Sequence, residues 1–257
     1  MVRINMNNRN QMALFNHTYS LNRTAIFNAK QFAGLTFSAC FLLFIYPSTG
    51  LDQLLIAPYF DVASHSFSLK HLVFLAQFMH TGLKYCMVFV AIASLLAALQ
   101  SNIHAAYRAS LFIFLKVLFK TPYFMAFVGM VLSTSVVAFL KSISIHGCPN
   151  DLTMYGGELP LLKLFEHLPA GIKAGHCFPG GHASGGFALM AFYFAFSDSK
   201  PRFATLMLVL GFVLGFAMGW AQMMRGEHFL SHNLWSAWLV WFVLFVLFVI
   251  KRMIEKN

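Results

Sequence analysis

Residues 203–222 of the chain read FATLMLVLGFVLGFAMGWAQ and contain no charged side chain. About 20 apolar residues in a helix are enough to cross the hydrocarbon core of a bilayer. Soluble domains average about 25% charged residues, whereas this chain has 10%, together with 59% hydrophobic residues and a mean hydropathy of +0.68. The stretch therefore predicts a membrane-spanning helix, and the composition predicts a membrane protein.

Further apolar runs bring the number of predicted spans to about six, so the predicted fold class is all-α, a polytopic integral membrane helix bundle. The predicted spans are 31–47, 83–100, 123–140, 183–197, 203–222 and 233–250. The fourth is short and is bounded by Pro179 and Pro201. Two more apolar stretches, 54–79 and 110–119, are interrupted by Pro, His or Lys residues. They are predicted to form interfacial helices or extensions of neighbouring spans.

Residues 1–30 are polar and basic and lack the apolar run and small-residue cleavage site of a signal peptide, so they predict a cytoplasmic tail before a membrane domain at 31–257. Six spans place both termini on one side of the membrane. Twelve of the 18 Lys and Arg residues fall on that side. The positive-inside rule then predicts cytoplasmic termini. The net charge of +10 fits anionic headgroups, and no nucleic-acid motif accompanies it.

The outward loops are predicted at 48–82, 141–182 and 223–232, and the last two are rich in reactive groups. These are Lys141, His146, Cys148, Asp151, His176, Cys177, His182, Arg225, Glu227, His228 and His232. Ionisable residues at a span end can snorkel to the interface, but snorkelling does not explain the five His among these residues. Polar groups gathered at one membrane face predict a functional site.

Two segments of these loops have a recognisable local design. FPGGHASGG (178–186) places two glycines before His182 at the start of a predicted helix, where free backbone amides can cradle an anion. A plain loop-to-helix turn is the alternative. RGEHFLSHNLW (225–235) places Arg225, His228 and His232 on one face if it is helical. Arg grips phosphate oxygens bidentately, and imidazole can attack phosphorus or move a proton.

These motifs resemble the type 2 phosphatidic acid phosphatase superfamily over about residues 123–250. The family's first motif is Lys, six residues, then Arg-Pro; here Lys141 is followed by Cys148-Pro149. The second, Pro-Ser-Gly-His, reads Pro179-Gly180-Gly181-His182. The third is Ser-Arg, five residues, His, three residues, Asp. Its nucleophilic His falls on His228, its Ser-Arg on Ala221-Gln222 and its Asp on His232. In a rival alignment His232 is the nucleophile, but its spacing from Arg225 is one residue too long.

The resemblance implies a lipid phosphatase that works without metal or other cofactor. His228 would attack phosphorus, and His182 would protonate the leaving oxygen and later activate water. Lys141 and Arg225, with Gly180 and Gly181, would bind the phosphate. His232, or alternatively Asp151 or Glu227, would orient the nucleophile.

Because the Arg of the first motif is missing, a different link between the motif loops is a further hypothesis. Cys148 and Cys177 lie in two motif loops on the oxidising side of the membrane and could form a disulfide. Two free thiols are the alternative, since sequence alone does not set the geometry.

The expected partner is a lipid phosphate in the outer leaflet, such as lipid A, undecaprenyl diphosphate, phosphatidate or phosphatidylglycerol phosphate. The amphipathic stretch 159–175 could guide such a lipid along the interface or form a packed lid. Phosphate transfer to another lipid is the near alternative to hydrolysis. A metal-dependent hydrolase would use zinc ligands from among His176, Cys177, His182, His228 and His232. A transporter would have charged groups at mid-bilayer rather than at one face. A structural membrane protein without catalysis is the remaining alternative.

Overall fold

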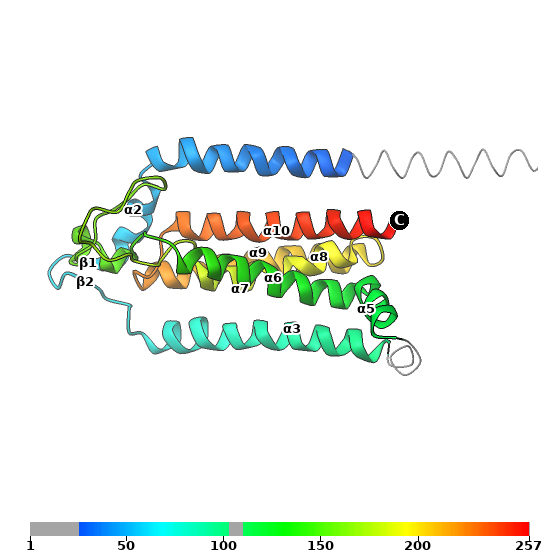
Figure 1. Cartoon of the computed structure of the whole chain (residues 1–257). Coiled ribbons are helices and arrows are strands. Elements are labelled where there is room, and N and C mark those ends of the chain that lie inside the picture. The colour runs from blue at the N-terminus through cyan, green and yellow to red at the C-terminus, as the bar shows by residue number, and fades with distance from the viewer. Residues whose placement is uncertain (1–25, 103–109, 257) are drawn as a thin grey trace, which may run out of the picture. The chain divides into compact units, whose positions relative to one another are not determined.

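The computed structural model describes residues 26–102 and 110–256 (Figure 1). The chain divides into two compact units, Met1–Cys40 and Phe41–Asn257. Most of the predicted tail, residues 1–25, lies outside the described residues. Five helices are long and apolar enough to cross a membrane, which shows an all-α, multi-pass membrane protein. They are Ile26–Ser48, Phe74–Gln100, Pro122–Ser142, Pro201–Met224 and Leu230–Glu255.

In the second unit, the spanning helices are named η4 (Phe74–Gly82), α3 (Leu83–Gln100), α6 (Pro122–Ser142), α9 (Pro201–Met224) and α10 (Leu230–Lys256). Local sequence explains where they begin. Proline occupies the first position of α6 and α9, where no backbone donor is needed. The hydroxyl of Thr121 caps α6 by accepting from the amide of Phe124. At α10 the carboxylate of Asp52 accepts from the amide of Ser231, 2.8 Å away.

The predicted fourth span is divided into two short helices, α7 (Gly181–Phe187) and α8 (Met190–Phe196), by a turn at Ala188 and Leu189. Both helices pack against α6, α9 and α10, and most of their residues are buried. A side chain added to Gly186 would come within 2.5–2.7 Å of the backbone of α9 at Leu214 and Gly215. Small residues thus let α7 lie directly on α9, as at many helix contacts in membranes.

The two interrupted apolar stretches differ from one another. Residues 74–82 extend the second span by a π-helical segment, η4, which runs directly into α3. The residues before it form α2 (Leu51–Ile56), a 3₁₀ turn, η3 (Ala57–Tyr59), and an antiparallel hairpin of β1 (Phe60–Asp61) and β2 (Ser66–Phe67) that pairs Phe60 with Phe67. The other stretch becomes a separate short helix, α5 (Leu111–Lys120), packed on α6.

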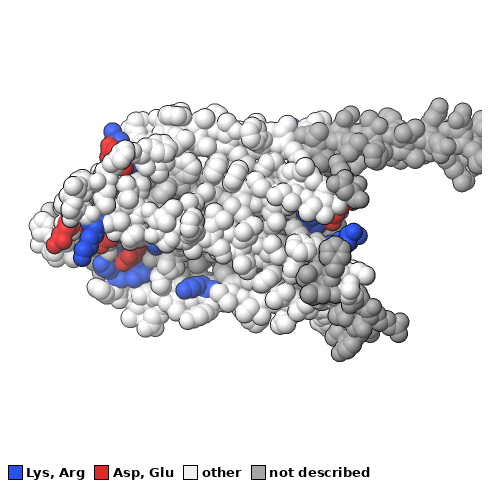
Figure 2. All heavy atoms as spheres, viewed as in Figure 1, with Lys and Arg blue, Asp and Glu red and all other residues white. Residues whose placement is uncertain are grey.

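The loops at one end of the bundle share a small apolar core. Its buried members are Ile56, Phe67, Leu152, Tyr155, Met223 and Phe229. They come from the α2–β2 region, from the loop after α6 and from the α9–α10 junction. The loop after α6 contains two further turns, η5 (Pro149–Asp151) and η6 (Thr153–Tyr155). Figure 2 shows Lys, Arg, Asp and Glu side chains gathered at this end, beside a long surface nearly free of them. This loop core fixes the α9–α10 junction, where the third motif lies.

Candidate active site

His228 lies in the short loop between α9 and α10 and is 2% exposed. Backbone hydrogen bonds hold this loop in place. The amide of Glu227 donates to the carbonyl of Gln222, and the amide of Asn150 donates to that of Gly226. The neighbouring Phe229 is anchored in the loop core. A histidine held so firmly, away from bulk water, is positioned by its surroundings rather than by its own rotamer preference.

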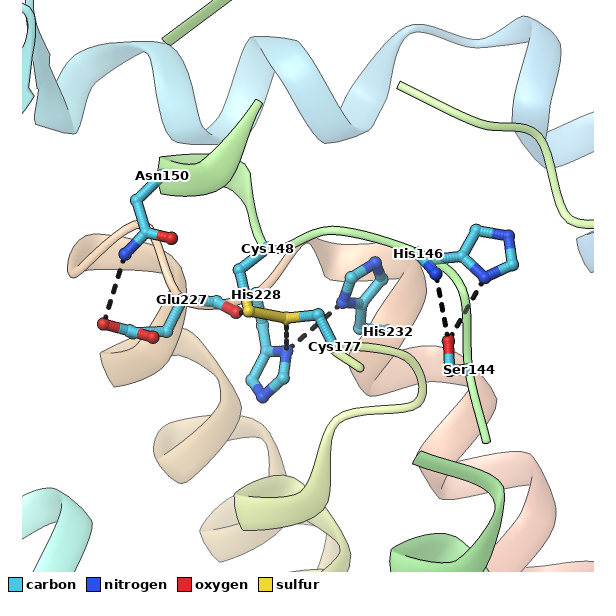
Figure 3. Close-up of a disulfide and its surroundings, with 8 residues drawn as sticks. All are labelled: Ser144, His146, Cys148, Asn150, Cys177, Glu227, His228 and His232. Carbon is cyan, nitrogen blue, oxygen red and sulfur yellow. Dashed lines mark hydrogen bonds between the residues drawn. A yellow bond between two sulfur atoms is a disulfide. The ribbon is translucent and has the colours of Figure 1, made fainter. Parts of the chain in front are cut away.

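The ring of His228 pairs with the ring of His232, which lies in the first turn of α10. Their Nδ1 atoms are 3.2 Å apart, so one ring donates a hydrogen bond and the other accepts it. If His228 donates, its proton is on Nδ1 and its Nε2 carries a free lone pair. Figure 3 shows the second ring nitrogen of His228 pointing away from His232 and from the disulfide. His232 therefore lies where it can hold the His228 ring with Nε2 directed away from both His232 and the disulfide.

The structure contains a disulfide between Cys148 and Cys177, directly beside His228 (Figure 3). Its Cys177 sulfur lies 3.4 Å from Nδ1 of His228 and 2.9 Å from the carbonyl oxygen of Glu227. The segments that carry the two cysteines also pair through their backbones, since the amide of Cys177 donates to the carbonyl of His146. The bridge joins the first-motif and second-motif loops against the third.

His182, the second residue of α7, faces an aromatic partner that the sequence analysis did not single out. The ring of His80, from η4, lies against it with a centroid distance of 3.8 Å and an interplanar angle of 36°. Lys84 follows one turn later. The sequence did carry a signal for this residue. His80 and Lys84 are four residues apart at the outward-facing start of a predicted span, so they would lie on one face of a helix.

Four basic side chains act electrostatically on His182: His80, Lys141, Lys84 and Arg225. Lys141 ends α6, and its side chain passes beside Gly181. Arg225 donates from Nε to the carbonyl of Lys70 and from Nη1 to the amide oxygen of Gln222. A guanidinium has five N–H donors, so three remain for a ligand. Gln222, 1% exposed, stands at the family's Arg position and holds Arg225 in place.

One predicted phosphate-binding group has another role in the structure. The amide of Gly180 donates to the carbonyl of His232 at 3.0 Å, so it is not free for phosphate. A side chain at residue 180 would lie 2.8 Å from the Oδ1 atom of Asn233. Glycine is needed there because the start of α7 lies directly on α10. Phosphate binding at Gly180 stays a prediction, and what the structure shows at this residue is an occupied amide and close packing.

Other candidates from the same loops have different contacts. His146 contacts the Ser144 hydroxyl through Nδ1 and the Lys163 carbonyl through Nε2. The carboxylate of Glu227 accepts from Asn150, and Asp151 offers its backbone carbonyl to the amides of Glu158 and Leu159. His176 has a positive φ of 50° in the loop before Cys177. These contacts leave His232 as the partner of the His228 ring.

The side chains around His228 include groups of the kind that bind metal ions. Within the described residues, one group of metal-ligand type comprises Cys177, His228 and His232. The Cys177 sulfur is bonded to Cys148 and is no thiolate, which leaves two imidazoles. Zinc in proteins takes at least three protein ligands, so this set does not fit one while the disulfide is intact.

Burial holds the pKa of His228 well below its usual value of 6.5, and the nearby His232, Lys141, His182 and His80 act in the same direction. A buried cation is costly because it loses water, and neighbouring positive charges raise that cost. The ring is therefore neutral at pH values where an exposed histidine would already be half protonated. A neutral imidazole is the form that can act as a nucleophile.

A groove of about 510 Å³ opens beside His182 and continues down the spanning helices. Lys84 and Gly181 line it near His182, and Ile92 on α3 and Phe127 on α6 line its far part. With a rise of 1.5 Å per residue, the lining stretch of α6 from Ala138 to Phe127 is about 16 Å long. That is close to half the thickness of a bilayer's hydrocarbon core.

A second cavity, of about 500 Å³, is lined in part by His232. Its lining includes His146, Asp52, Trp235 and residues 161–166. The amphipathic stretch 159–175 thus forms no helix, and its first part covers this cavity as a loop.

The order of the three motifs, their meeting at one end of the bundle and the paired His residues agree with a comparison of sequences. The model of the PAP2 superfamily, the type 2 phosphatidic acid phosphatases, matches residues 122–256, more than half of the chain. The chain belongs to the PAP2 superfamily. It is thus a phosphatase-type membrane enzyme. No curated protein and no solved structure gave a significant match. His80 and Lys84 precede the matched region and lie outside the family's motifs.

Proposed function

We propose that this PAP2 protein hydrolyses a phosphomonoester or diphosphate of a membrane lipid through a phosphohistidine on His228. The observation that carries the chemistry is the Nδ1–Nδ1 contact of His228 and His232. It supports a tautomer of His228 with a free Nε2 in a buried, positively charged site. Phosphoryl transfer depends mainly on positioning and on neutralising charge, and Lys141 and Arg225 supply that charge.

The reaction has two balanced steps. Nε2 of His228 attacks phosphorus, the bond from phosphorus to the leaving oxygen breaks, and His182 gives its proton to that oxygen. In the second step, His182 takes a proton from water, and the resulting hydroxide attacks phosphorus as the P–N bond breaks. Inorganic phosphate leaves, and both histidines return to their starting forms. His232 keeps the proton of His228 on Nδ1 throughout.

The groove beside His182 supports a lipid as the substrate. It is lined mostly by apolar side chains and reaches about one leaflet deep along α3 and α6. A single acyl or prenyl chain could lie in it with its phosphate at His182. A water-soluble phosphate ester has no apolar chain that could fill such a groove.

The proposed location of the site is the periplasmic face of a bacterial inner membrane, with both termini cytoplasmic. The uneven distribution of Lys and Arg supports this orientation. The disulfide of Cys148 and Cys177 supports it independently, because disulfides persist in the periplasm and not in the cytosol.

The test uses purified protein in detergent with EDTA and four lipids: phosphatidate, phosphatidylglycerol phosphate, undecaprenyl diphosphate and lipid A. Release of phosphate from at least one lipid is expected, with a loss of about a thousandfold or more in His228→Ala. When the phosphate of the substrate is labelled and unlabelled lipid alcohols are added, hydrolysis and transfer can be distinguished. A transferase moves the labelled phosphate to the alcohol, whereas a hydrolase releases it. No release and no transfer with any of the lipids would contradict the proposal.

A further inference from the structure

His80 comes from a part of the chain that the family match does not cover, yet its ring lies on the ring of the proposed proton donor. The two rings are in close, tilted contact, with their centroids 3.8 Å apart and their planes at 36°. The segment that carries His80, η4, is π-helical and packs against α9. Short π-helical segments recur at functional sites because they change the direction of side chains within a helix.

The contact is important because of what else holds His182. Throughout the described residues, the His182 ring has no hydrogen-bond partner, whereas His228 is held by His232. A general acid must keep its proton aimed at the leaving oxygen. In the free enzyme, the tilted ring of His80 is the aromatic contact that restricts the plane of His182.

The contact of His80 with His182 lies at the mouth of the groove in which the lipid is proposed to bind. Lys84, one turn after His80, lines the groove together with His182 and Gly181. His80 also acts electrostatically on His182 and on His228. η4 and the start of α3 therefore form the wall that faces the second and third motifs.

We propose that His80 is a positioning residue of the active site, which holds the plane of the His182 imidazole through the close, tilted contact of the two rings. This inference rests on the proposed function. The flat ring performs the role, and a proton on His80 is not needed for it. A planar side chain without ionisable nitrogen should therefore substitute for His80, and a small one should not.

The experiment compares His80→Ala with His80→Phe, and dioctanoyl phosphatidate and farnesyl diphosphate serve as short-chain probes. His80→Ala is expected to lower kcat about tenfold to a hundredfold with little change in KM, because a misaligned catalytic group slows chemistry more than binding. His80→Phe is expected to restore most of kcat. His71→Ala is the matched control, an exposed histidine of the same region, and should behave like the wild type.

A second readout does not depend on turnover. In protein with labelled histidines, the ring protons of His182, assigned with His182→Gln, should be shielded by the His80 ring that lies against them. The shielding should disappear in His80→Ala and persist in His80→Phe.

The outcomes separate the two proposals. An active wild type whose His80→Ala variant keeps full kcat, or whose His80→Phe variant is as slow as His80→Ala, would overturn the role of His80 alone. A wild type inactive on every lipid would overturn the proposed function itself.

Discussion

Nδ1 of His228 lies 3.2 Å from Nδ1 of His232, the residue that the motif alignment sets at the aspartate of the family's third motif. In the proposed mechanism, the orienting partner of the nucleophile is thus an imidazole and not a carboxylate. An imidazole can accept the Nδ1 proton of His228, as a carboxylate would, but it brings no negative charge to stabilise the phosphorylated ring. His232 should therefore be essential for orientation, although it provides less electrostatic help than an aspartate.

Replacing His232 tests this orienting role. His232→Ala should lower kcat about a hundredfold or more, because the wrong tautomer of a catalytic histidine is severely impaired. His232→Asp restores an acceptor at Nδ1 and should stay within about tenfold of the wild type. Phosphate release by the purified variants is the measurement. Wild-type rates in His232→Ala would mean that another group orients His228.

The pH dependence of activity should reflect the lowered pKa of His228. Burial first, then the neighbouring cationic groups, disfavour its protonated form, so the nucleophile remains neutral below pH 6.5. The acid limb of kcat/KM, which reports the free enzyme, should therefore lie below pH 6.5. The measurement is kcat/KM between pH 4 and pH 8. An acid limb centred at or above pH 6.5 would contradict the lowered pKa of His228.

Reducing the disulfide should destabilise the active-site end of the bundle. The bridge closes a sequence separation of 29 residues, and the chain-entropy relation gives about 3–4 kcal/mol for such a loop. A reductant, or Cys148→Ala with Cys177→Ala, should lower both Tm and phosphate release. The matched control is Cys40→Ser with Cys86→Ser, since these two cysteines are free and exposed. Equal loss in the control pair would point to a general effect of cysteine removal.

Blocking the groove should separate long-chain from short-chain substrates. Ala138 lines the groove on α6, so Ala138→Trp should raise KM about tenfold for a long-chain lipid and leave dioctanoyl phosphatidate nearly unaffected. Ala93→Trp is the control, because Ala93 is exposed on α3 outside the groove lining. An equal KM for long-chain lipid in Ala138→Trp and the wild type would show that the chain lies elsewhere.

Much of this fold follows from patterns in the sequence. Apolar runs such as 203–222 predict spans because the bilayer fixes both their length and their composition, and α9 forms there. The ends of the spans were less predictable. The second span begins at Phe74, because η4 precedes α3 and includes His80, and the fourth span is divided at Ala188. Such details depend on contacts between helices, like that of Gly186 with α9.

The site was predicted only in part. Motif spacing indicated His182 and His228, but it could not show that the Gly180 amide is occupied by the His232 carbonyl. Nor could it place His80 on His182, because that contact joins residues about a hundred positions apart and no motif includes both. Periodicity reports on local structure, whereas such pairings are decided by the packing of whole helices.

The central claim is that the phosphoryl group passes through His228. The most direct measurement is to mix wild-type protein with a ³²P-labelled lipid phosphate, stop the reaction within one turnover and map the labelled peptide. An acid-labile, base-stable label on His228, absent from His228→Ala, is the predicted result. A label on another residue, or one that persists in His228→Ala, would contradict it.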